Sequence, residues 1–166
     1  MPPRLALRIP AAPHTRGIVV RAALVHDVGK LVLSTRPPRH FARALFEAHW
    51  GQVPLYANER QLAGVTHAKV GAYLLGIWGW PSPVVEAVAH PHHPEAAIPN
   101  DVLDSVGIVQ IANILAHEAA TGPSHSSAIP HQTIEPGYLD RFGIADQYRD
   151  WLEMANAMAT NATASR

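Results

Sequence analysis

The apolar residues of this sequence recur three or four positions apart along most of its length, which is the spacing of a buried helix face. Between Gly17 and Ser34 the recurring positions are Val20, Leu24, Val28, Leu31 and Val32. The same spacing predicts further helices over residues 38–50, 54–62, 67–78, 83–90, 101–120, 136–143 and 145–158. No segment shows the alternation of apolar and polar residues that marks a half-buried strand. The pattern therefore predicts an all-α fold.

Single residues predict where some of these helices end and which faces they bury. Gly51 and Gly64 are expected to end helices, and Thr66 is expected to cap the start of the helix over 67–78. Gly71 and Gly76 inside that helix indicate either a close approach of two helices or simple tolerance of glycine. The core-facing side chains expected from the helices over 38–50 and 67–78 are Phe41, Leu45, Phe46, Trp50, Val70, Leu74, Leu75 and Trp78.

The predicted helix over 101–120 is largely apolar but carries one polar stripe. Gln110, Asn113 and His117 lie three and four positions apart, so they share one face of that helix. A polar stripe on a buried helix indicates either shared hydrogen bonds or a binding site.

Composition narrows the class of protein. The chain has 166 residues, of which 48% are hydrophobic and 16% charged, as expected of one compact domain. Thirteen basic and 13 acidic residues cancel, so no positive field is available to drive nucleic-acid binding. Cysteine is absent, which excludes disulfides, thiol nucleophiles and cysteine-ligated metals. Any metal would be held by histidine, carboxylate or water.

The sequence also lacks the patterns of secreted or membrane-spanning chains. Arg8, Pro10 and Pro13 interrupt the N-terminal segment before an apolar run of signal-peptide length can form. The most apolar segment, Gly71 to Trp80, is too short to span a bilayer. We therefore expect a cytoplasmic protein with no membrane partner.

A histidine–aspartate pair, His26-Asp27, interrupts the apolar run of the first predicted helix. A buried aspartate needs a cation, a metal ion or several hydrogen-bond donors. In one interpretation both side chains reach a metal ion beside the helix. In the other, which these residues alone favour, His26 caps a neighbouring helix and Asp27 pairs with Lys30 three residues later.

Longer stretches around this pair resemble a known family. The segment from Leu24 to Leu33 resembles the His-Asp helix of the HD superfamily. Glu59-Arg60 followed by Gly64 to Pro81, with Val85 to Ala89, is similar to the HDOD subfamily. The resemblance implies an HD-superfamily bundle of about six to eight helices. It covers residues 17–158, preceded by an N-terminal arm or truncated helix over 1–16 and followed by a flexible tail over 159–166.

In catalytic relatives, such as the HD-GYP phosphodiesterases, the bundle holds metal ions that activate a water molecule against a phosphodiester. The resemblance assigns His26 and Asp27 to the signature pair, His67 to the histidine of the following helix, and Lys30 to the phosphate contact. It assigns His92 to one of two paired histidines. Iron, manganese or another ion that prefers nitrogen and oxygen ligands is the metal it implies.

Three departures weaken that site. The upstream helix that supplies an early ligand is missing or truncated, and Pro91 disturbs the paired histidines. Asn113 stands where the family has an aspartate ligand. Asp27 is then the only matched carboxylate, an unfavourable charge balance for more than one divalent ion.

These departures favour an HDOD-type regulatory or signal-transduction module that is non-catalytic, with a protein partner in a signalling pathway of bacterial type. The alternative is a metal-dependent phosphohydrolase acting on a cyclic nucleotide or dinucleotide, with His90 or His93 as a substitute ligand. A third interpretation is an incomplete domain, whose exposed apolar groove would make it a homo-oligomer.

Overall fold

The computed structural model describes residues 9, 13–35, 38–51, 53–90, 103–121, 133–134 and 136–164, and all of its regular elements are helices. The predicted all-α fold is therefore confirmed over these residues. The helices are α2 (Pro13–Val25), α3 (Val28–Thr35), α4 (Pro38–Gly51), α5 (Leu55–Ala63), α6 (His67–Ile77), α7 (Ser82–Ala89), α8 (Ser105–Thr121), α9 (Pro136–Arg141) and α10 (Ala145–Ala164).

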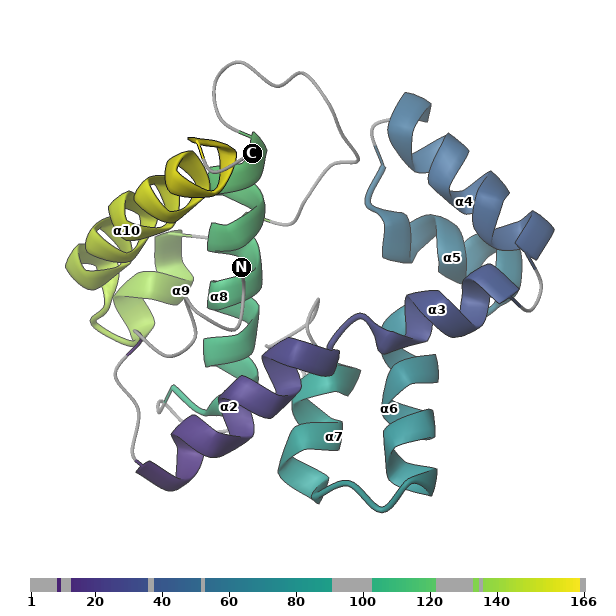
Figure 1. Ribbon diagram of the computed structural model, residues 1–166, viewed down its shortest axis with the longest axis horizontal. Helices are drawn as coiled ribbons and strands as arrows, with labels where there is room; N and C mark the ends of the chain where they lie inside the picture. The colour runs from purple at the N-terminus through teal and green to yellow at the C-terminus, as the bar shows by residue number, and fades with distance from the viewer. Residues whose placement is uncertain are drawn as a thin grey trace.

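The helices form a larger and a smaller group, which α3 and α6 connect (Figure 1). The main core lies among α2, α6, α7, α8 and α10, and its buried side chains include Val19, Leu75, Val88, Leu115 and Trp151. The smaller group is the pair α4 and α5, which buries Ala44, Ala48 and Leu55 in a cluster of its own. A polar site between the two groups can therefore draw residues from both.

Helices α3 and α6 approach each other closely at two glycines. A Cβ atom added to Gly71 would lie 3.1 Å from the Gly29 nitrogen. A Cβ added to Gly29 would lie 2.7 Å from the Gly71 nitrogen and would overlap the carbonyl oxygen of His67. The close approach that Gly71 indicated is confirmed, whereas Gly76 has no atom within 4 Å of such a Cβ. This contact holds α3 against the first turn of α6.

The prediction of one helix from Gly17 to Ser34 is wrong, because the chain breaks at His26 and Asp27. Helix α2 ends at Val25 and α3 begins at Val28. The break changes which face is buried, so Leu24 and Leu31 are 66% and 69% exposed instead of lying in the core.

Three aromatic side chains predicted to face the core are exposed instead: Phe46, Trp50 and Trp78. In α4 the buried side chains are Ala44 and Ala48, because the close packing of α4 on α5 leaves room only for small side chains.

Two helix ends lie where single residues of the sequence predicted them. Gly64 ends α5 with φ at 72°, as expected of a glycine, and the Thr66 hydroxyl accepts a 3.3 Å hydrogen bond from the Lys69 amide at the start of α6. The last helix continues to Ala164, beyond its predicted end at 158. None of the described helices is both long and apolar enough to cross a bilayer.

Candidate functional site

The carboxylate of Asp27 lies at the break between α2 and α3 and is surrounded by basic side chains. The Lys30 ammonium is 2.8 Å from Asp27 Oδ2 and donates a hydrogen bond to it. His26 Nε2 lies 3.4 Å from Oδ2, and His67 Nε2 lies 3.6 Å from Oδ1. The pairing of Asp27 with Lys30 that the spacing predicted is confirmed. The structure thus brings together four of the predicted site residues.

His26 is oriented by its own helix. Its Nδ1 lies 3.0 Å from the carbonyl oxygen of Ala23, and since a carbonyl oxygen accepts, Nδ1 carries the donating hydrogen. The prediction that His26 caps a neighbouring helix is therefore wrong, because the carbonyl belongs to the last turn of α2. The bond leaves Nε2 as the ring atom that faces Asp27.

His67 is oriented by a carboxylate from α5. Glu59 Oε2 accepts two hydrogen bonds from His67, one from the backbone amide at 2.8 Å and one from ring Nδ1 at 2.6 Å. Both side chains are almost completely buried, at 1% exposure for Glu59 and 3% for His67. Glu59 thus caps α6 and turns His67 Nε2 toward Asp27.

The sequence did not single out Glu59 as a site residue. Its signal is the helical spacing of α5, because Glu59 lies four positions after the buried Leu55 and therefore on the same buried face. A carboxylate on a buried face requires a partner, which here is the histidine that begins the next helix.

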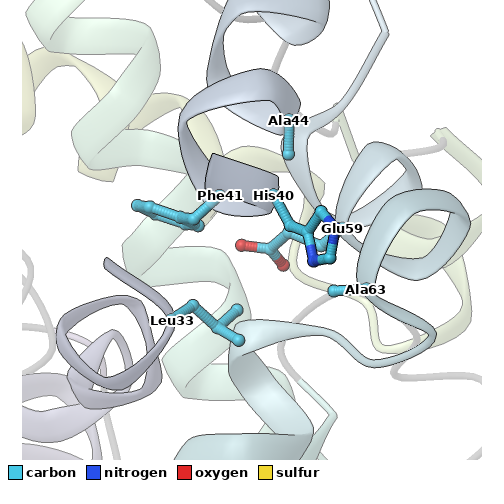
Figure 2. Close-up of a pocket in the computed structure, with 6 residues that line it drawn as sticks. All are labelled: Leu33, His40, Phe41, Ala44, Glu59 and Ala63. Atoms are coloured by element: carbon cyan, nitrogen blue, oxygen red, sulfur yellow. The ribbon is translucent and has the colours of Figure 1, made fainter. Parts of the chain in front are cut away.

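The second oxygen of Glu59 has a different environment. Oε1 has no hydrogen-bond partner among the described residues. The Glu59 side chain lines a small pocket between α3, α4 and α5 (Figure 2). The other residues of its lining are Leu33, His40, Phe41, Ala44 and Ala63. Because this environment is mostly apolar, Glu59 depends on His67 for its polar contacts.

The basic neighbours also control the charge of Asp27. Burial by itself would raise the pKa of the Asp27 carboxyl, but the charges of His26 and Lys30, the hydrogen bond from Lys30 and the charge of His67 outweigh it. The net effect places the pKa of Asp27 below its ordinary value of 3.8. Asp27 is therefore an anion at neutral pH.

The remaining predicted residues are not shown to join this cluster. Asn113 is buried in α8, and its Oδ1 makes no hydrogen bond within the part of the chain that the structure describes. Gln110 Oε1 on the same stripe is likewise unpaired among these residues, so neither oxygen takes part in the expected shared hydrogen bonds. His92 and His93 lie outside the described residues. His90 ends α7, and its Nε2 lies 3.5 Å from the Lys69 ammonium.

The described residues can be compared with only part of the metal centre that the HD resemblance implies, since His92 lies outside them. The described residues include no group of three or more histidine, aspartate or glutamate side chains placed to hold a metal ion. At the signature pair, one oxygen of the carboxylate already binds the Lys30 ammonium. Asp27 is the one carboxylate that matches the ligands of the family, because Asn113 stands where the family has an aspartate, and this charge balance is unfavourable for more than one divalent ion.

Comparison with known proteins agrees with the fold and with the family resemblance. The family model of the HDOD domain matches residues 6–94, which is more than half of the chain and includes α2 to α7. A crystal structure of a "Putative signal transduction protein" from Marinobacter aquaeolei VT8 is similar, with a TM-score of 0.66 and 22% sequence identity. The similarity covers 99% of this chain but 36% of that one, and at this identity it shows the fold alone. No curated protein matches the chain. By the match to its family model, the chain belongs to the HDOD domain family.

Proposed function

We propose that this chain is a non-catalytic regulatory module of signal transduction, in which the His-Asp pair is a structural element. The observation that carries the proposal is Asn113, a neutral amide where the family resemblance places an aspartate ligand, which leaves Asp27 as the one matched carboxylate. The ion pair between Lys30 and Asp27, at 2.8 Å, then has a structural role. The polar groups around it, from Lys30 through Asp27 and His67 to Glu59, connect α3, α6 and α5 and stabilise their arrangement.

A protein partner is part of the proposal. Several large apolar side chains of the described helices are exposed, and surfaces of this kind support association with another protein. They are Leu24, Leu31, Phe46, Trp50, Val53, Tyr73, Ile77 and Trp78. HDOD family membership and the signalling protein with the same fold support a pathway of signal transduction.

Hydrolysis assays test the non-catalytic part of this proposal. The wild-type chain, purified without chelator, is incubated with added Mn²⁺ or Fe²⁺ and with phosphodiester substrates that include cyclic mononucleotides and dinucleotides. The expected result is turnover no greater than that of Asp27→Asn, which serves as the control for a contaminating hydrolase. Metal-dependent turnover in the wild type that is lost in Asp27→Asn would overturn the proposal.

One observation favours the alternative of a metal-dependent phosphohydrolase. His67 donates Nδ1–H to the buried Glu59, and metal-binding histidines commonly donate their second ring nitrogen to a carboxylate in this way. In that alternative His26, Asp27, His67 and His92 hold the ion and Lys30 contacts phosphate. The comparison with Asp27→Asn distinguishes the two functions.

A further inference from the structure

We infer that the outer face of α4 is a contact surface between two copies of this chain, which meet through their α4 helices in antiparallel orientation. Four residues of that face, which we call the α4 seam, are Arg39, Arg43, Phe46 and Trp50. They lie four, three and four positions apart, which is the spacing of the seam along which two helices pack.

The α4 seam exposes the large apolar side chains of a helix that buries only small ones. Phe46 and Trp50 are 65% and 70% exposed, whereas Ala44 and Ala48 on the opposite face are buried. A surface helix normally turns its large apolar side chains inward, where they remove the most area from water. The two exposed rings contact each other, with centroids 6.2 Å apart, and therefore form one continuous apolar surface.

The α4 seam is accessible to another molecule over the part of the chain that the structure describes. Helix α4 packs mainly on α5 and α3, and it lies at the outer edge of the smaller group of helices (Figure 1). Arginine and tryptophan are the residues that most often dominate the binding energy of protein interfaces. The α4 seam therefore has both the position and the composition of a contact surface.

Charge along the α4 seam favours an antiparallel second copy. The seam is basic toward its start, at Arg39 and Arg43, and aromatic toward its end, at Phe46 and Trp50. Glu47 pairs with Arg43 at 2.7 Å, but an exposed pair of this kind is weak. Two parallel seams would set arginine against arginine. Two antiparallel seams set Arg43 of each copy against Trp50 of the other, where a cation–π contact can form.

A second copy fits the α4 seam better than a lipid surface does. A helix that lies on a membrane carries its basic residues on the face opposite its aromatic ones, whereas here both share one face. The 13 basic and 13 acidic residues of the chain cancel, so two copies carry no net charge that would keep them apart. The signalling partner of the proposed function is a separate matter, because Tyr73, Ile77 and Trp78 on and just after α6 are exposed outside this contact.

Sedimentation equilibrium of the purified chain tests this pairing. A contact between single helices is smaller than a standard interface, so we expect a weak dimer with a dissociation constant on the order of 100 µM. Trp50→Ala should weaken the dimer at least about tenfold, because it removes the largest apolar group of the α4 seam. Trp78→Ala is the matched control, since Trp78 is 60% exposed, and should leave the dissociation constant unchanged.

A second pair of variants tests the cation–π contact. Arg43→Gln should weaken the dimer about two- to fivefold. Arg149→Gln is its control, because Arg149 is also exposed and paired with an acidic residue of its own helix, Asp146. It should dimerise as the wild type does.

Cross-linking tests the orientation, because the chain has no cysteine of its own. Arg39→Cys and Val53→Cys place single thiols at the start of α4 and just after its end, where Val53 is 38% exposed. Each variant alone and an equal mixture of the two are treated with a short bis-maleimide. Antiparallel pairing predicts cross-linked dimers in the mixture and none in either variant alone.

Several results would overturn the pairing. A wild-type chain that stays monomeric up to about 1 mM would do so, and so would a dimer that Trp50→Ala leaves unchanged or that Trp78→Ala weakens as much. Cross-links within Arg39→Cys alone would exclude the antiparallel orientation. Binding of a monomeric wild type to phosphatidylglycerol vesicles that is lost in Trp50→Ala would assign the α4 seam to a membrane instead.

Discussion

The contact between α3 and α6 makes Gly29 the position where the smallest substitution should have a large effect. In Gly29→Ala the new Cβ would overlap the His67 carbonyl oxygen and lie 2.7 Å from the Gly71 nitrogen. Overpacking commonly costs about 1 to 3 kcal/mol when side chains can shift. Here both obstructing atoms belong to the backbone of α6, so we expect about 3 kcal/mol or more of lost stability. That corresponds to a melting temperature lowered by roughly 6 to 12 °C.

Urea unfolding followed by circular dichroism measures this loss. Gly76→Ala is a matched control, because Gly76 also lies in α6 but has no atom within 4 Å of an added Cβ. The control should gain about 0.5 to 1 kcal/mol from the better helix propensity of alanine. If Gly29→Ala unfolded within about 1 kcal/mol of the wild type, helices α3 and α6 could not be packed as closely as described here.

Three other predictions concern the polar groups. The stability advantage of the wild type over Asp27→Asn should be complete above about pH 4 and should shrink as the pH falls further. The reason is that the pKa of Asp27 is lowered in the folded state, so folding favours the anion. Denaturant unfolding at a series of acidic pH values measures this difference. Glu59→Ala should cost about 3 kcal/mol, since it leaves two buried donors of His67 unpaired, and Glu59→Gln should cost clearly less in the same denaturant assay. Burial and the nearby Glu118 raise the pKa of the Tyr148 phenol. Ultraviolet titration should therefore show one tyrosine that ionises at a higher pH than the others, and this titration step should be absent in Tyr148→Phe.

Features that depend on a few neighbouring residues could be predicted from the sequence. The helical class follows from apolar spacing, and the end of α5 at Gly64 and the start of α6 at Thr66 follow from local backbone preferences. The Lys30–Asp27 pair could likewise be predicted, because three residues separate its members.

Features set by tertiary packing could not be predicted in the same way. Apolar spacing continued through His26 and Asp27, so the break between α2 and α3 and the exposure of Leu24 and Leu31 were missed. The role of Glu59 depends on the turn that brings α5 against the start of α6. The family resemblance identified His67 but gave no indication of which side chain would orient its ring.

We propose that the His-Asp pair is a structural element and holds no catalytic metal. The most direct test is the metal content of the wild-type chain, purified without chelator, dialysed against Mn²⁺ and then freed of unbound ion. The account predicts fewer than about 0.1 ion per chain. A ratio near one ion per chain that falls to background in Asp27→Asn would contradict it.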